Sequence, residues 1–233
     1  MLTIELAGEE VRLLRERALF WPRQRTLFIA DTHFGKAATF QSHGIPIPTG
    51  NTATDLARLA ALLAATQAEE LVILGDFWHA ARGRSAETVA LLAAWRAGCA
   101  EVSIRLIRGN HDRAAGDPPP EWNIACENPG AAAEPFTLAH EPLDQAGGYV
   151  LAGHLHPAIR LAESCGGGMR SPCFWVTPRM CVLPAFGGFT GAKCVTAVEG
   201  DRLFAIGPDE VVEVRTVTAN HRPSRRKSTP QKT

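Results

Sequence analysis

The chain has 233 residues, of which 45% are hydrophobic, and it carries 24 basic and 24 acidic side chains. This composition is typical of a soluble core, whereas a membrane partner is not expected because no apolar run is long enough to span a bilayer. Acidic residues near the N-terminus stand where a signal peptide would be apolar, so secretion is not expected. Six cysteines without a C-x-x-C pair favour free thiols, so the sequence predicts a cytoplasmic protein.

Short β-rich runs recur along the first two thirds of the chain, and each is nearly continuous in apolar residues. Five of them are expected to be strands, at 26–35, 71–79, 103–112, 136–142 and 149–157. Continuous apolar strands are typical of a sheet that is covered on both faces. Beyond these runs the chain changes to shorter strands broken by Gly and Pro, which favours an antiparallel second sheet.

Two helices are expected between the first three strands. Residues 51–70 repeat leucine at the spacing of one helical face. Residues 85–98 begin with Ser85, a good N-cap, and end at Gly98. This alternation of strand and helix predicts an α/β fold, which we interpret as a single domain over residues 1–218.

The C-terminal end of the chain is basic. Residues 221–233 contain five Arg or Lys and no acid, which leaves 19 basic and 24 acidic residues in the rest of the chain. We therefore expect residues 219–233 to form a basic, disordered tail. Such a tail could bind a polyanion or could be a solubilising terminus.

Side chains of the metal-binding type follow each of the five expected strands. In chain order they are Asp31, His33, Asp76, Asn110, His140, His154 and His156. In open α/β sheets the carboxyl ends of the strands form the ligand crevice, so these side chains are expected to gather there. One polar residue at a strand end would need no explanation, but so many in one crevice would be costly to desolvate without a cation.

The chemistry of these donors indicates the metal. Carboxylate, amide and imidazole groups without a thiolate favour Mn²⁺, with Fe or Zn²⁺ as alternatives. Seven donors exceed the needs of one four-coordinate ion, and two ions roughly 3.5–4 Å apart that share a carboxylate would use them all. Two divalent ions with a bridging hydroxide are suited to the hydrolysis of a phosphodiester.

The same residues form an ordered set of short motifs. The motifs are D-x-H at 31–33, G-D at 75–76, G-N-H-D at 109–112, a single His140, and G-H-x-H at 153–156. In this order they resemble the calcineurin-like metallophosphoesterase superfamily. The resemblance implies two packed mixed β-sheets flanked by helices, an α/β/β/α sandwich of four layers.

The resemblance also implies a role for each motif residue. One ion would be held by Asp31, His33 and His156, the other by Asn110, His140 and His154, with Asp76 as the bridge. His111 would stabilise the transition state or protonate the leaving oxygen, which is chemically suited to an imidazole. Asp112 would orient His111.

Segments beside the motifs narrow the resemblance. Residues 30–50, 74–80 and 183–193 are similar to the bacterial ligase-associated DNA-damage-response endonucleases, which are linked with an ATP-dependent DNA ligase, a helicase and an exonuclease. The similarity implies an endonuclease for single-stranded DNA in DNA repair. His79 stands where the protein-phosphatase pattern G-D-x-x-D-R-G places Asp, which disfavours a Ser/Thr phosphatase.

Three residues next to the motifs are candidate substrate contacts: Lys36, His79 and Arg113. Lys36 could reach a substrate phosphate, and Arg113 could contact a nucleic-acid backbone, although loop and rim positions are ordinary places for both. Trp78, Phe186 and Phe189 could stack on the bases of single-stranded DNA. Core packing is the usual role of an aromatic side chain and is favoured for Trp78.

Two other functions stay open at this point. The first is a phosphoesterase or pyrophosphatase for a small molecule such as a nucleotide or a lipid precursor. The second is a scaffold that keeps the fold without the chemistry, which is disfavoured because a competent residue occupies every ligand position. The basic tail and the flanking segments favour DNA, while the acidic remainder of the chain weakens that choice.

Overall fold

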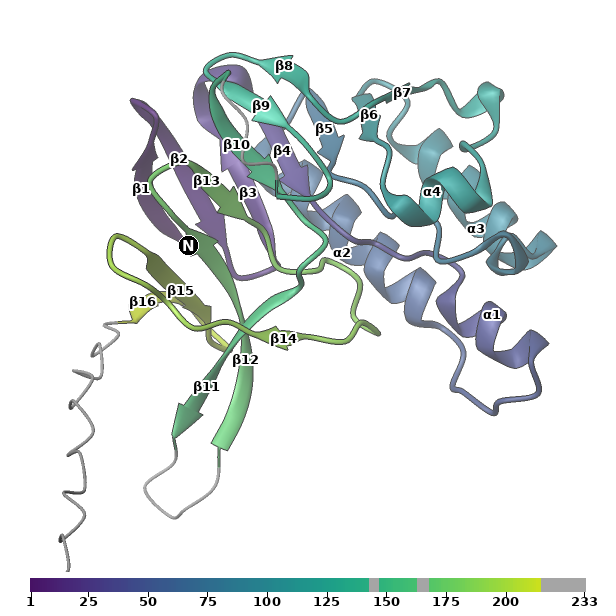
Figure 1. Ribbon diagram of the computed structural model, residues 1–233. Helices are drawn as coiled ribbons and strands as arrows, with labels where there is room; N and C mark the ends of the chain where they lie inside the picture. The colour runs from purple at the N-terminus through teal and green to yellow at the C-terminus, as the bar shows by residue number, and fades with distance from the viewer. Residues whose placement is uncertain (143–146, 163–167, 215–233) are drawn as a thin grey trace, which may run out of the picture.

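A computed structural model describes residues 1–142, 147–162 and 168–214 of the chain. Two mixed β-sheets pack against each other, and the α-helices lie on one side of them (Figure 1). This arrangement confirms the α/β fold class with two packed mixed sheets. The basic tail expected at 219–233 lies outside the described residues, and among those that are described no helix has the length and apolar character needed to cross a membrane.

The first sheet has seven strands that follow one another in chain order. They are β1 (Leu2–Leu6), β2 (Glu9–Leu14), β3 (Ala18–Trp21), β4 (Thr26–Ile29), β5 (Glu70–Ile73), β6 (Ser103–Ile107) and β7 (Ile124–Glu127). Pairing is antiparallel from β1 to β4 and parallel from β4 to β7. The parallel half contains the first three predicted strands, whereas β1 to β3 were not predicted.

Four α-helices and three short 3-10 helices lie in the described part of the chain. They are α1 (Lys36–Ser42), α2 (Asn51–Thr66), α3 (Ala86–Gly98), α4 (Asn110–Ala115), η1 (Pro22–Gln24), η2 (Ala81–Gly83) and η3 (Pro120–Trp122). Both predicted helices are confirmed as α2 and α3. The Ser85 side chain caps α3 by accepting a hydrogen bond from the backbone N–H of Thr88 at 3.2 Å.

The second sheet has nine strands. They are β8 (Ala131–Ala133), β9 (Phe136–Leu138), β10 (Tyr149–Ala152), β11 (Pro157–Ala162), β12 (Gly168–Val176), β13 (Met180–Val182), β14 (Lys193–Cys194), β15 (Arg202–Ile206) and β16 (Val211–Val214). It is mixed and not antiparallel throughout, because β10 pairs in parallel with both β9 and β13. The fourth and fifth predicted strands, β9 and β10, therefore belong to this sheet and not to the sheet of β4, β5 and β6.

Two apolar cores hold the layers together. On β4, Leu27 and Ile29 face the leucines of α2, while Phe28 faces the second sheet together with Ala30, which directly follows the strand. Both faces are thus removed from water, which explains why residues 27–30 are continuously apolar. The two cores place the carboxyl ends of β4, β5 and β6 next to those of β9 and β10.

The expected fourth layer is absent from the described residues. After η3 the described chain contains strands and turns, and no α-helix covers the outer face of the second sheet. A smaller apolar cluster around Cys173 and Leu203 occupies that face. The connection from β12 to β13, at residues 177–179, is a hairpin and is too short to hold a helix. Five of the six cysteines are described and all five are free thiols, as expected.

Candidate metal centre

The backbone turns sharply at five of the seven candidate ligands. Asp31, His33, Asp76, His154 and His156 have φ values of 46° to 69°, in the left-handed region. Residues other than glycine rarely adopt this conformation, although Asp and His tolerate it better than most, and such strain is concentrated at functional sites. The turns follow β4, β5 and β10 and direct the side chains into one crevice between the sheets.

Glycines in the motifs allow the close approach of neighbouring segments. A Cβ atom added to Gly75 would overlap the ring of His140, and one added to Gly109 would overlap the carboxylate of Asp76. Gly75 also has a positive φ of 82°. The G-D and G-N-H-D motifs therefore require glycine because the candidate ligands occupy the space of a side chain.

The first group of candidate ligands is Asp31, His33 and His156, whose donor atoms lie close enough together to hold one metal ion. The His156 Nε2 atom is 3.3 Å from Asp31 Oδ1 and 3.4 Å from His33 Nε2. The opposite ring nitrogen, His156 Nδ1, donates to the backbone carbonyl of Gly191 at 3.0 Å. This hydrogen bond fixes the tautomer in which Nε2 presents a lone pair to the crevice.

The second group is Asp76, Asn110, His140 and His154. The His140 Nε2 atom lies 3.1 Å from Asn110 Oδ1, 3.1 Å from His154 Nδ1 and 3.4 Å from Asp76 Oδ1. His140 Nδ1 donates to the carbonyl of Leu74 at 3.0 Å, which again leaves Nε2 to face the crevice. All seven residues that the motifs single out are thus brought together in two adjoining groups.

Asp76 lies between the two groups. Its Oδ2 atom is 3.8 Å from His33 Nε2, while its Oδ1 atom faces His140 and accepts the His111 backbone N–H at 3.0 Å. Burial acts to raise the pKa of this carboxyl, but the hydrogen bond and charge of His140 outweigh it and hold the pKa below its ordinary value. Asp76 is therefore ionised and placed as a bridging ligand would be.

The donor set fits a pair of divalent cations. Asp31 is fully buried, and its Oδ1 atom has no hydrogen-bond partner among the described residues. Burial lowers the pKa of His33 to about 3, so the ring is neutral and has a lone pair to donate. Burial also acts to lower the pKa of His140, but hydrogen bonding to Asp76 and the charges of both aspartates raise it to about 9. The crevice thus attracts positive charge.

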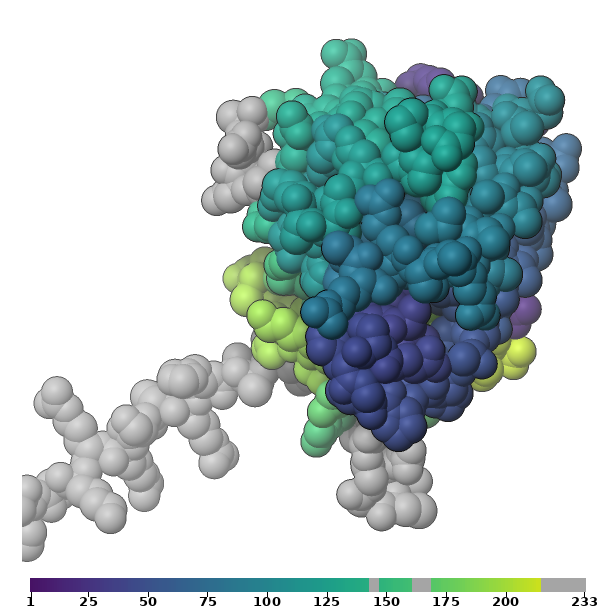
Figure 2. All heavy atoms as spheres, turned by 90° about the vertical axis from the view of Figure 1, so that its right-hand side faces the viewer, coloured from purple at the N-terminus to yellow at the C-terminus, as the bar shows by residue number. Residues whose placement is uncertain are grey.

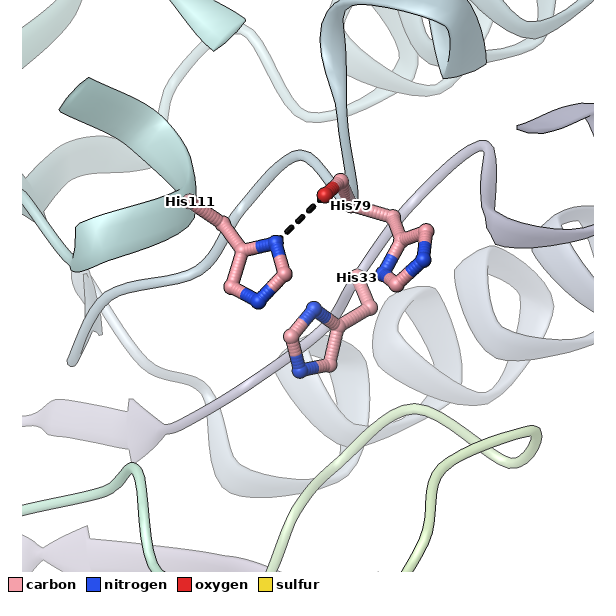
Figure 3. Close-up of side chains that lie close together, drawn as sticks. All are labelled: His33, His79 and His111. Atoms are coloured by element: carbon pink, nitrogen blue, oxygen red, sulfur yellow. Dashed lines mark hydrogen bonds between the residues drawn. The ribbon is translucent and has the colours of Figure 1, made fainter. Parts of the chain in front are cut away.

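His111 sits at the start of α4, beside the first group. Figure 3 shows its ring close to those of His33 and His79, with Nδ1 directed at the backbone carbonyl of His79, to which it donates a hydrogen bond. The Nε2 atom lies 3.8 Å from Asp76 Oδ2. The ring is therefore held through Nδ1, and Nε2 is turned toward the crevice.

Asp112 does not contact the His111 ring in the expected way. Its carboxylate accepts hydrogen bonds from the backbone N–H groups of Gly109, at 2.9 Å, and Trp78, at 3.2 Å. These bonds join the turn after β5 to the start of α4. Asp112 thus fixes the backbone before His111 and the turn that carries His79, and the carbonyl of His79 takes the place expected for the Asp112 carboxylate.

The three candidate substrate contacts differ in position. The Lys36 ammonium lies 5.4 Å from the ring centroid of Phe189, and burial lowers its pKa. The His79 ring stacks on that of His111, with centroids 5.2 Å apart, and burial together with Lys36 and His111 lowers its pKa to about 4. The structure places both beside the metal centre, whereas Arg113 faces Glu141 at 3.7 Å on the surface.

The aromatic residues that are candidates for base stacking also differ in exposure to solvent. Trp78 and Phe186 are fully buried in the core, while Phe189 is 36% exposed. Phe40, which the sequence analysis missed, stacks on His79 and meets Phe189 edge to face, each pair with centroids 6.0 Å apart. The rings of His79, Phe40 and Phe189 thus form a row leading away from the crevice.

The segments that carry these rings pack together. In the space-filling view of the helical side, α1 (dark blue), which contains Phe40, lies against the segment that includes η2 (Figure 2).

Asp55 was also missed. It is buried on α2, and both of its carboxylate oxygens accept the backbone N–H of Gly188, in the loop that follows β13. The available signal was an acid on the apolar face of the helix, four residues before Leu59 and eight before Leu63.

The chain is similar in sequence to a known protein family and in fold to solved structures. The sequence pattern of the calcineurin-like phosphoesterases matches residues 24–158. The fold is similar to the crystal structure of Pseudomonas putida nuclease MPE, with a TM-score of 0.81 and 41% sequence identity over 91% of this chain and 99% of that chain. A more distant structure is Yfce, a phosphoesterase from E. coli, with a TM-score of 0.42 and 15% identity over 81% and 97% of the two chains.

No match is found among curated proteins. The matched family covers more than half of the chain and includes every motif of the metal centre. The MPE similarity extends over nearly the whole of both chains. The chain therefore belongs to the calcineurin-like phosphoesterase family and is a metal-dependent phosphoesterase.

Proposed function

We propose that the protein is a phosphodiesterase that uses two divalent ions, most favourably Mn²⁺, to cut DNA as an endonuclease in DNA repair. The observation that carries this proposal is the position of Asp76 between two groups of ligands, one with Asp31, His33 and His156, the other with Asn110, His140 and His154. An adjoining pair of cation sites is suited to clamping the two oxygens of an in-line phosphoryl displacement.

The chain's own residues have separate tasks in this reaction. The two ions would supply Lewis acidity and lower the pKa of a water molecule. His111 is held by the carbonyl of His79 so that its Nε2 atom faces the crevice, where it would donate a proton to the leaving oxygen. Asp112 holds the two turns that carry His79 and His111.

Single-stranded DNA is the substrate that the surroundings of the site favour. Phe189 exposes an aromatic face next to the Lys36 ammonium, and the ring row of Phe40 and His79 leads from it to His111. An unpaired base can stack on such a face while a cation meets the adjacent phosphate, and a paired base cannot. Lys36 and His79 would be the substrate contacts, whereas Arg113, engaged with Glu141, would contact only DNA that extends beyond the crevice.

The cellular setting that we propose is supported by similarity alone. The structural neighbour is named a nuclease, and the flanking segments resemble endonucleases linked with an ATP-dependent DNA ligase, a helicase and an exonuclease. We place the protein with such partners in the cytoplasm.

A substrate panel tests the proposed function. The purified protein would be assayed with Mg²⁺, Mn²⁺, Fe²⁺ and Zn²⁺ on circular single-stranded DNA, linear single strands, duplex DNA and a small phosphodiester. We expect cleavage of the circular single strand, which has no ends, with Mn²⁺. Turnover of the small ester without binding or cleavage of DNA would instead support a small-molecule phosphoesterase.

Replacement of Phe189 by alanine is expected to raise KM for single-stranded DNA about tenfold, because base stacking on an aromatic ring contributes roughly 1–3 kcal/mol. The turnover of a small phosphodiester without a base should not change. The matched control is Leu91→Ala on α3, since Leu91 is also 36% exposed. An equal rise in KM for both substrates would contradict a stacking role.

A further inference from the structure

The loop of residues 183–191, here called the glycine loop, closes one side of the metal centre. Its Phe186 N–H donates to the carbonyl of Ala30 at 2.7 Å, and its Gly187 N–H donates to the carbonyl of Asp31 at 3.1 Å. Its Gly191 carbonyl accepts the hydrogen bond from His156 Nδ1. The loop therefore touches two of the three ligands in the first group.

Charged side chains from other elements hold the glycine loop by its backbone. The Asp55 carboxylate accepts the Gly188 N–H at 3.1 and 3.0 Å through its two oxygens. Arg58, one turn later on α2, pairs with Asp55 Oδ1 at 3.0 Å and donates to the carbonyl of Phe186. Arg17 donates to the carbonyl of Gly187 at 3.4 Å. The loop is thus held by this ionic network in addition to its backbone hydrogen bonds to Ala30 and Asp31.

Asp55 is an unusual residue for its position. It is 5% exposed and shares the face of α2 that packs its leucines against the first sheet. Burial of the carboxylate is unfavourable even when it is paired, and a leucine would suit the helix face better. A Cβ atom on Gly188 would lie 3.2 Å from Asp55 Oδ1, so the glycine leaves room for the carboxylate to reach the backbone.

We propose that Asp55 is a positioning residue for the ion that Asp31, His33 and His156 would hold. The inference rests on the proposed two-ion function. Through the Gly188 N–H it fixes the glycine loop, whose Gly191 carbonyl holds His156 Nδ1 and so aims Nε2 at Asp31 Oδ1. Groups that orient a ligand in this way set its affinity for the metal.

The test is a Mn²⁺ titration of the metal-free, full-length protein by calorimetry. The parent should bind two equivalents. In Asp55→Leu, which suits the helix face and removes the acceptor of the Gly188 N–H, one equivalent should weaken about 10- to 100-fold, as is typical when a ligand's hydrogen-bonded support is removed, while the other keeps its affinity. Should Asp55→Leu fail to fold, Arg58→Met, which changes a partly exposed side chain of the same network, should show the same selective loss.

The matched control is Arg96→Met. Arg96 is also buried and charged, and it also holds backbone carbonyls, those of Trp122 at 2.7 Å and Cys99 at 2.6 Å, without touching the glycine loop. Unchanged binding of both equivalents in folded Asp55→Leu, or the same loss in Arg96→Met, would overturn the positioning role. If the parent protein binds fewer than two equivalents of Mn²⁺, the result would instead contradict the proposed two-ion function, and this inference would be wrong as well.

Discussion

Replacement of Asp76 by alanine is expected to reduce DNA cleavage about a thousandfold or more, a loss at the upper end of what removal of one electrostatic group costs. Its two carboxylate oxygens face His33 on one side and His140 on the other. Without them both groups of ligands lose the donor they share. Calorimetric titration should therefore show that neither equivalent of Mn²⁺ binds with the affinity of the parent.

Two further variants separate loss of metal from loss of structure. Alanine also leaves the buried N–H of His111 without its acceptor, which costs about 1–3 kcal/mol of folding free energy. Asp76→Asn keeps an oxygen for that N–H but loses the charge, so it should fold like the parent and still bind Mn²⁺ poorly. Asp117→Ala removes an exposed acid that pairs with Arg108 and should change neither property. Normal occupancy of both sites in Asp76→Ala would mean that the bridge is assigned wrongly.

The parallel half of the first sheet was predictable because strands that are buried on both faces have nearly continuous runs of apolar residues. Leu27 and Ile29 pack on helices and Phe28 packs on the second sheet, so after Thr26, its first residue, β4 has only apolar residues. The capped helix after Ser85 was predictable for a similarly local reason, since the cap and the residue it serves are three positions apart.

The antiparallel edge was missed because its signal is mixed. In β1, Ile4 and Leu6 are buried between exposed residues, and in β2 the charges of Glu9, Glu10 and Arg12 dilute the apolar pattern. Strands covered on one face alternate, and short alternating runs beside many charges are hard to distinguish from loops.

Strand order in the second sheet could not be read from the sequence. The parallel pairing of β10 with β9 and β13 joins segments that have no common local pattern, and it takes two of the five predicted strands out of the first sheet. The prediction that the strand ends gather at one place nevertheless holds, because the two sheets pack with these edges adjoining. The motif residues are recognised by their side-chain type and by their position after a strand. Their clustering could therefore be predicted even though two strands were assigned to the wrong sheet.

The supporting contacts were the least predictable part of the site. The group that holds His111 is the backbone carbonyl of His79, and the group that holds His156 is the carbonyl of Gly191. A carbonyl is present at every residue, so no residue type marks the one that is used. Asp55 did leave a signal, but an isolated acid on a helix face does not indicate which distant loop it binds.

Replacement of His111 by alanine is expected to lower kcat on DNA by about 10²- to 10⁴-fold, the usual contribution of a general acid, with both equivalents of Mn²⁺ still bound. The imidazole is held through Nδ1 by the His79 carbonyl, and Nε2 is turned toward the crevice, on a side chain that is 35% exposed. A proton from Nε2 matters most when the leaving oxygen is a poor leaving group, as the alkoxide of a DNA strand is.

The dependence on the leaving group makes this prediction specific. A small phosphodiester that releases p-nitrophenolate needs little protonation, so His111→Ala should impair its turnover far less than it impairs DNA cleavage. His43→Ala is the control, because the hydrogen bonds of that exposed imidazole within the described residues go to the preceding helix α1, at the carbonyl of Thr39 and the Ser42 hydroxyl. Loss of a metal equivalent in His111→Ala would make His111 a ligand. Equal losses on both substrates would mean that it stabilises charge in the transition state, because a proton donor must discriminate between an alkoxide and a phenolate.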